Sequence, residues 1–200
     1  MTRSLRIITA SLFLTLFSLL PVYAQGDDEQ APEPASSAVA APERGATPVR
    51  ITIPSLGLDT DVIPVGTDEY GAMADPDDPD MVAWYSLGPG LARFGNVVLA
   101  GHVDWDGQLR AFGRLQTISE GDEITLWNEA GQAYSFFVDS SDWVDADGAT
   151  VDEIFGQSLE SRVTLITCGG LYDPFQGQYL QRLIVRGHAT TASSGPAMSN

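Results

Sequence analysis

Residues 162–170 read Arg-Val-Thr-Leu-Ile-Thr-Cys-Gly-Gly, so that a run of β-branched and apolar residues leads directly into a cysteine and two glycines. A run of this kind bounded by glycine is typical of a buried β-strand. Cys168 is therefore expected at the end of such a strand, beside backbone that carries little side-chain cover. This stretch indicates both the class of fold and the place where its chemistry lies.

Short strands are expected on either side of this stretch. Residues 96–100 (Asn-Val-Val-Leu-Ala) form a continuous apolar run, as expected for a strand buried on both faces, and residues 179–186 form another strong strand. Weaker runs predict further strands at residues 50–54, 60–65, 123–127 and 133–138, the last two joined as a hairpin. Helical patterns are limited to one turn in 107–114 and one short helix in 150–158. We therefore expect a mainly β fold, closed or sandwiched.

Composition narrows the range of functions. The chain has 200 residues, with 10 basic and 27 acidic side chains and a net charge of −17. A field of that sign repels phosphate backbones, so nucleic acid is not an expected partner. All the basic residues are arginine, which excludes a lysine nucleophile. A single cysteine excludes an intramolecular disulfide and any multi-cysteine metal site.

The first 24 residues resemble an export signal. Arg3 and Arg6 precede an uncharged, mainly apolar run at residues 7–20, and Val22-Tyr23-Ala24 offers small residues two apart. This order is typical of a cleaved secretory signal. A retained membrane anchor through residues 7–20 is the alternative, although the run is short for a bilayer span. Either reading predicts an extracytoplasmic protein, secreted or anchored on the outer face of the cytoplasmic membrane.

The composition changes again after residue 24. Residues 25–47 are rich in proline and alanine and lack large apolar side chains, so they predict a disordered linker. We expect the folded domain at residues 48–190 and a flexible tail at 191–200.

Cys168 is the expected reactive group. An unpaired cysteine in an exported protein is a liability unless the thiol has a function, although a free cysteine can also be a small core residue. A reactive thiol needs a cationic or proton-accepting neighbour. His102 directly follows the strand at 96–100, and Arg182 lies in the middle of the strand at 179–186, where an isolated charge is costly. His188 is expected to be a solvated residue near the tail.

These three residue types indicate thiol acyl chemistry. Cys168 would attack a carbonyl carbon, His102 would transfer a proton to the leaving amine, and Arg182 would donate hydrogen bonds to the substrate or oxyanion. Arg186 is in phase with Arg182 but lies nearer the strand end, where we expect a surface charge.

Residues 164–168 (Thr-Leu-Ile-Thr-Cys) resemble the T-L-x-T-C signature of sortases, which are cysteine transpeptidases outside the membrane of mainly Gram-positive bacteria. The chain order of His102, Cys168 and Arg182 is also similar, and the likeness covers residues 49–189. The resemblance implies a closed eight-stranded sortase-type β-barrel with one or two short helices, in which these three residues are catalytic. It also implies that Thr167 lines the substrate-binding groove. The two glycines after Cys168, together with short loops, make the chain resemble the less studied sortase classes E and F.

The resemblance further implies a reaction and its partners. Sortases cleave a sorting signal, often of Leu-Pro-x-Thr-Gly type, on a surface protein, hold it as a Cys thioester, and transfer it to an amine from a cell-wall precursor or pilin subunit. Many sortases keep the N-terminal segment as an anchor, whereas Val22-Tyr23-Ala24 makes this one look cleavable. Two alternatives remain open: a cysteine endopeptidase of the same fold that uses water, and a non-catalytic exported β-domain that binds a partner.

Acidic runs raise the question of a metal. The segment Asp75-Pro76-Asp77-Asp78-Pro79-Asp80 is dense in hard oxygen ligands, which suit Ca²⁺. Aspartate runs broken by proline are more typical of solvated turns. We expect no required cofactor, with Ca²⁺ as the alternative.

Overall fold

A computed structural model describes residues 44–148 and 151–189 of the chain. The expected signal at 1–24 and tail at 191–200 lie outside the described residues, as does the linker apart from residues 44–47. In that short stretch Ala46 exchanges main-chain hydrogen bonds with Leu91 at 2.9 and 2.8 Å, as an isolated β-bridge. No helix in the described part of the chain is long and apolar enough to cross a bilayer.

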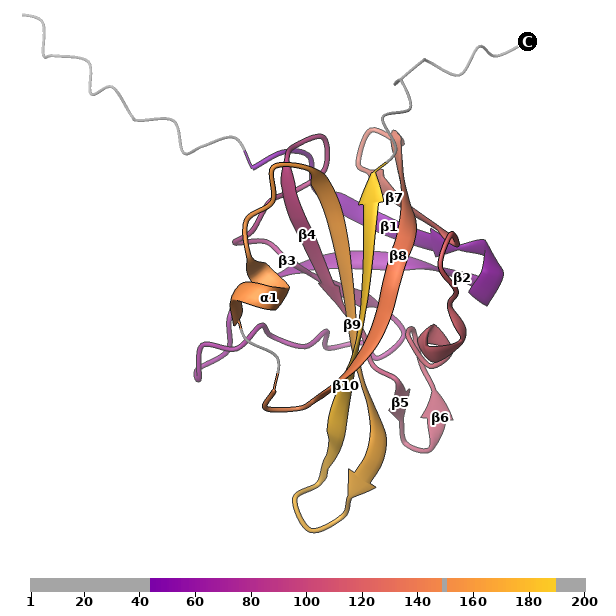
Figure 1. Cartoon of the computed structure of the whole chain (residues 1–200), viewed down its shortest axis with the longest axis vertical. Coiled ribbons are helices and arrows are strands. Elements are labelled where there is room, and N and C mark those ends of the chain that lie inside the picture. Colours follow the sequence, from indigo (N-terminus) through magenta and orange to yellow (C-terminus); the bar gives the residue numbers. More distant parts are fainter. Residues whose placement is uncertain (1–43, 149–150, 190–200) are drawn as a thin grey trace, which may run out of the picture. The chain divides into compact units, whose positions relative to one another are not determined.

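Eight strands close into a barrel in the order β1-β2-β3-β4-β9-β10-β8-β7, and β7 pairs back to β1 (Figure 1). The pairs β2/β3 and β4/β9 are parallel, and the other pairs are antiparallel. The expected closed, eight-stranded, mainly β fold is confirmed. The barrel strands are β1 (Pro48–Ile53), β2 (Leu58–Val65), β3 (Val82–Tyr85), β4 (Gly95–Ala100), β7 (Glu123–Asn128), β8 (Ala133–Asp145), β9 (Ser161–Asp173) and β10 (Gln178–Ala189).

The remaining elements are short and lie in the connections between barrel strands. They are the hairpin β5 (Asp104–Trp105) and β6 (Gln108–Leu109), the helix α1 (Val151–Phe155), and 3₁₀ turns at Pro54–Leu56 and Leu115–Thr117. The helix expected within 150–158 is present but brief. Of the helical turn expected in 107–114 only the end forms, where the Gly113 N–H donates to the Arg110 carbonyl at 2.8 Å. Asp106 and Gly107 have φ values of 54° and 73°, which make a tight turn between β5 and β6 instead.

Strand alternation sorts the side chains into a barrel interior and an outer face. Burying each aliphatic side chain inside contributes about 1.5–3 kcal/mol, so the strands around Cys168 are held firmly. Inward residues on the three strands nearest this cysteine are fully or almost fully buried: Val97, Leu99, Val163, Leu165, Leu183 and Val185.

The outer face of β9 is partly covered as well. Thr164 is 2% exposed and its hydroxyl donates to Asn96 Oδ1 at 3.0 Å. The amide of Asn96 donates in turn to the carbonyl of Ile154 in α1 at 2.7 Å. This chain of bonds holds α1 against the outer face of β4 and β9.

Strands β9 and β10 continue past the barrel as a two-stranded hairpin, which Figure 1 shows extending below the rest of the sheet. The pairing shifts register between Tyr179 and Gln181 of β10, opposite Gly170 of β9, whose φ is 73°. A positive φ of this kind favours glycine and is typical of a β-bulge. Cys168 therefore lies where the barrel wall becomes the free hairpin.

Candidate active site

Cys168 of β9 and Arg182 of β10 lie side by side, and His102 lies two residues after the end of β4, on the other side of β9; we call these three positions the row. Cys168 of β9 is the direct partner of Arg182 in β10. On the other side, the parallel pairing of β4 with β9 ends at Ala100 and Ile166, two residues before His102 and Cys168 respectively. That register, continued for two more residues, makes His102 the counterpart of Cys168 that strand alternation predicts.

Two hydrogen bonds extend the contact between β4 and β9 to this row. The Gly101 N–H donates to the carbonyl of Ile166 at 3.1 Å, and the Thr167 hydroxyl donates to the carbonyl of Gly101 at 2.8 Å. Thr167 is 4% exposed, so this second bond is shielded from water. It joins the residue before the histidine to the residue before the cysteine.

The chain around His102 is shaped by close packing. A side chain at Gly101 would collide with the ring of Phe112, which is itself fully buried. The Phe112 N–H donates to the His102 carbonyl at 3.0 Å, and the imidazole lies edge-on to Trp105 with ring centroids 5.2 Å apart. Its Nε2 is 3.4 Å from the carbonyl of Pro76, so His102 is half-buried between two loops.

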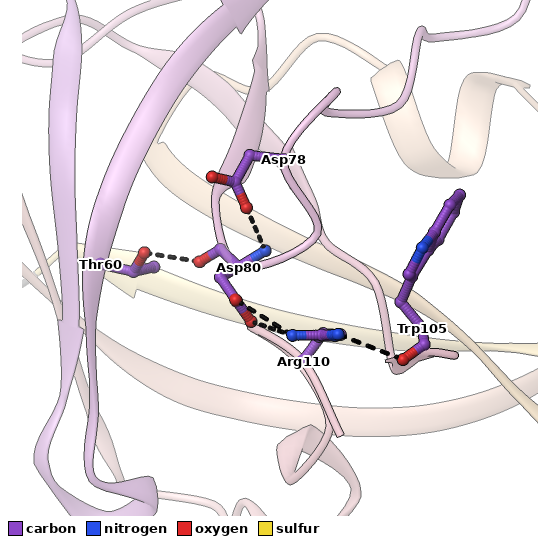
Figure 2. Close-up of polar contacts among 5 residues, drawn as sticks. All are labelled: Thr60, Asp78, Asp80, Trp105 and Arg110. Carbon is purple, nitrogen blue, oxygen red and sulfur yellow. Dashed lines mark hydrogen bonds and ion pairs between the residues drawn. The ribbon is translucent and has the colours of Figure 1, made fainter. Parts of the chain in front are cut away.

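Those two loops are tied together by Arg110 (Figure 2). Its guanidinium donates to the Asp80 carboxylate at 3.1 Å and to the Trp105 carbonyl at 3.3 Å. The loop that carries Asp80 is fixed in turn by Thr60, whose hydroxyl donates to the Asp80 carbonyl at 2.7 Å, and by Asp78, which accepts the Asp80 N–H at 3.0 Å. The acidic run is thus a structured turn at the site.

The metal question concerns this same acidic run. Within residues 44–148 and 151–189, no group of three or more His, Cys, Asp or Glu side chains converges as metal ligands would. Asp78 and Asp80 instead serve the turn and the ion pair just described.

Cys168 itself is half-buried beside a small pocket. The pocket has a volume of about 120 Å³ and is lined by Cys168, Thr167, Trp143 and Tyr179 among others. A side chain at Gly169 would collide with the indole of Trp143, so glycine is required there to let the ring close over the backbone next to the sulfur.

Burial decides the ionisation of the thiol. It raises the pKa of Cys168 above the usual value, and the neighbouring guanidinium of Arg182 opposes this rise. The carboxylates of Asp75 and Asp104 raise the pKa further. Burial therefore favours the neutral thiol of Cys168 over the thiolate needed for attack.

Arg182 is held by the main chain. Its Nη1 donates to the carbonyls of Tyr179 and Gln181, both at 3.0 Å. Among the described residues its hydrogen bonds use Nη1 only, which leaves Nε and Nη2 to donate to a bound molecule.

Two further residues belong to the site and were not expected there from sequence. The Tyr179 hydroxyl donates to Asp104 Oδ2 at 2.8 Å, and this hydrogen bond is the largest cause of a raised pKa of Tyr179. Asp104 lies two residues after His102, and no local pattern marks it as the partner of a tyrosine 75 residues away. Tyr179 lies three residues before Arg182, and nothing in the strand pattern distinguishes it from other strand aromatics.

His188 and Arg186 lie away from this row. His188 is exposed, pairs across the sheet with Arg162, and has Nδ1 2.6 Å from Asp139 Oδ1. Arg186 is the partner of Thr164, two pairs along the same face, and its guanidinium is 3.2 Å from Asp142. Both occupy the surface positions expected for them.

Comparison with known proteins agrees with the barrel topology. The family model described as Sortase domain matches residues 51–190. No curated protein matches the chain.

Solved structures with the same fold include sortase A of Listeria monocytogenes, with a TM-score of 0.53 and 23% identity over 73% of this chain and 88% of that one. Sortase C1 of Streptococcus agalactiae has a TM-score of 0.54 and 24% identity over 72% and 68%. Sortase C1 of Streptococcus suis has a TM-score of 0.55 and 19% identity over 74% and 75%. At these identities the structures show a shared fold.

Proposed function

This chain belongs to the sortase family, and from that premise we propose that it is an extracytoplasmic cysteine transpeptidase with Cys168 as nucleophile, His102 as proton carrier and Arg182 as oxyanion or substrate donor. The proposal is supported by the way β4, β9 and β10 lie next to one another and lead into these residues. Cys168 pairs directly with Arg182, and His102 follows Gly101, which is hydrogen-bonded to Ile166 and Thr167.

The reaction follows from the groups in that row. The Cys168 sulfur attacks the carbonyl carbon of the scissile peptide bond, and Nε and Nη2 of Arg182 stabilise the negative charge on the carbonyl oxygen. The C–N bond then breaks, and His102 gives its proton to the departing amine. The acyl group stays on sulfur as a thioester. An incoming amine attacks it, loses a proton to His102, and releases the thiol for another cycle.

Thiolate and imidazolium must be present together for the first step. Burial raises the pKa of Cys168 and so opposes formation of the thiolate. Attack needs the thiolate and departure of the amine needs a proton, so the rate should follow a bell-shaped dependence on pH.

The surface next to Cys168 suits an apolar extended peptide. One pair along the outer face, Ala100 and Ile166 are only partly buried, and they give an apolar floor beside the sulfur. We assign the substrate as a sorting signal of Leu-Pro-x-Thr-Gly type on a surface protein, and the acceptor as an amine of a cell-wall precursor or a pilin subunit. The export signal expected at residues 1–24 supports a location on the outer side of the membrane.

The test is a cleavage assay on a library of fluorogenic Leu-Pro-x-Thr-Gly-type peptides, with and without a short amine acceptor. Transfer predicts that added amine redirects the acyl group into a new amide product. An endopeptidase that uses water predicts a product ratio that ignores the amine, and a binding module predicts no cleavage. Cys168→Ala should abolish both products, and cleavage that persists in this variant would refute the assignment of the nucleophile.

A further inference from the structure

Tyr179 is bonded both to the segment that follows His102 and to the side chain of Arg182. Its hydroxyl donates at 2.8 Å to Oδ2 of Asp104, which lies two residues after His102. Its carbonyl accepts from Nη1 of Arg182 at 3.0 Å. Tyr179 and Cys168 also line the same small pocket. One residue therefore connects the loop of the histidine with the side chain of the arginine.

The bulge in the hairpin explains how Tyr179 reaches this position. Tyr179 pairs with Tyr172, whereas Gln181 pairs with Gly169, so two residues of β9 oppose one residue of β10. A bulge of this kind increases the local twist and redirects the neighbouring side chains, and bulges are common next to active sites. The ring of Tyr179 packs edge-on against Tyr172 with centroids 5.2 Å apart, which fixes its direction.

The bond to Asp104 is suited to holding a loop. It joins β5 to β10 across 75 residues of sequence, and both side chains are partly buried. A hydrogen bond from a hydroxyl to a carboxylate is stronger than one between neutral groups. The next residue, Trp105, is held at its carbonyl by Arg110 at 3.3 Å, so the loop after His102 is fastened at two consecutive positions from different elements.

We propose that Tyr179 is a positioning residue that fixes His102, through Asp104, and Arg182, through its own carbonyl, on either side of Cys168. The inference rests on the proposed function of this site. It adds a residue that acts on the reaction without touching the reacting atoms.

The charge of Asp104 gives a way to measure this role. The charged groups that act on the Cys168 thiol are Arg182 from β10, Asp75 from the segment between β2 and β3, and Asp104 from β5, and the thiol in turn acts on Tyr179 of β10. Asp104 raises the pKa of the thiol because its carboxylate is held nearby. If Tyr179 is what holds it, removing the Tyr179 hydroxyl must weaken the influence of Asp104 on Cys168.

The experiment is a double-mutant cycle on the full chain, read out as the pH dependence of Cys168 alkylation by iodoacetamide. Asp104→Asn should lower the midpoint pH of alkylation in the otherwise unchanged protein. In the Tyr179→Phe background the same substitution should shift the midpoint by less than half as much. An equal shift in both backgrounds would overturn the proposal. This readout needs no peptide substrate, so it remains decisive if the proposed transpeptidation fails.

Turnover of the fluorogenic peptide gives the second readout. Tyr179→Phe should lower kcat by roughly 10-fold with KM nearly unchanged, because a misplaced catalytic group slows chemistry more than binding. Tyr172→Phe is the matched control, since it removes a hydroxyl from the neighbouring ring, and it should leave kcat unchanged. Asp104→Ala removes the same hydrogen bond from the other side and should lower kcat likewise if Tyr179→Phe does not fold. Unchanged kcat in both Tyr179→Phe and Asp104→Ala would refute a positioning role.

Discussion

Replacing Thr167 by valine tests whether its hydroxyl holds the site together or faces the substrate. The resemblance to sortases implied a substrate-binding role for Thr167. The structure shows its hydroxyl donating to the Gly101 carbonyl at 2.8 Å, in a position that is 4% exposed. Valine has nearly the same shape, so the substitution removes this hydrogen bond with little change in packing.

The expected loss of stability follows from that geometry. A net hydrogen bond contributes about 0.5–1.5 kcal/mol, and a buried carbonyl left without a donor costs about 1–3 kcal/mol. Together these predict a loss of roughly 1–3 kcal/mol. For a domain of this size, that corresponds to a fall in Tm of about 3–10 °C. Calorimetry of the full chain measures it directly.

Catalysis should change in a matching way. Without the bond, Gly101 and the His102 that follows it are no longer fixed against β9, so kcat should fall by roughly 10-fold while KM stays nearly constant. Thr164→Val is the matched control, because Thr164 is equally buried in the same strand and donates to Asn96 at 3.0 Å, two pairs from the catalytic row. It should cost similar stability and leave kcat unchanged. A Thr167→Val variant with unchanged Tm and a raised KM would instead show that the hydroxyl binds substrate.

The other substitutions probe the electrostatics and the supports of the site. Arg182→Gln should raise the pKa of Cys168 and Asp75→Asn should lower it, because the guanidinium favours the thiolate and the carboxylate opposes it. Alkylation rates of Cys168 measured against pH should therefore shift in opposite directions in the two variants. Shifts in the same direction would contradict the account. Arg110→Ala should lower kcat by roughly 10-fold, because the two loops around the imidazole are no longer tied, and full activity would exclude a supporting role. His188→Ala should leave peptide turnover unchanged, and a large loss would mean that the wrong histidine has been assigned.

The strands that build the site could be predicted because residue types that favour buried strands lie directly before His102 and Cys168. The β-branched run before Cys168 and the apolar run before His102 both form buried strands that end next to each other. The four-residue strand Val82–Tyr85 was missed because a run that short does not establish a period. Strands β9 and β10 are longer than expected because their ends leave the barrel and carry exposed residues such as Leu171 and Phe175.

The hydrogen bonds that hold the site residues in place could not be predicted in the same way. Thr167 and Gly101 are 66 residues apart, and Tyr179 and Asp104 are 75 residues apart. Each contact depends on the closure of the barrel or on the bulge in the hairpin, and neither feature has a local sequence pattern. The tight turn at Asp106-Gly107 was not predicted because the residues that follow it also suit a helical turn. The positive φ values of these two residues form a hairpin turn instead.

The central claim is that Cys168 carries the acyl group during turnover. Intact-mass analysis of the full chain, mixed with the peptide library and quenched in acid, tests it most directly. We predict a mass increase equal to the acyl portion of the cleaved peptide, located on Cys168, lost on adding an amine and absent from Cys168→Ala. Peptide cleavage that proceeds without any adduct on Cys168, or that persists in Cys168→Ala, would contradict the account.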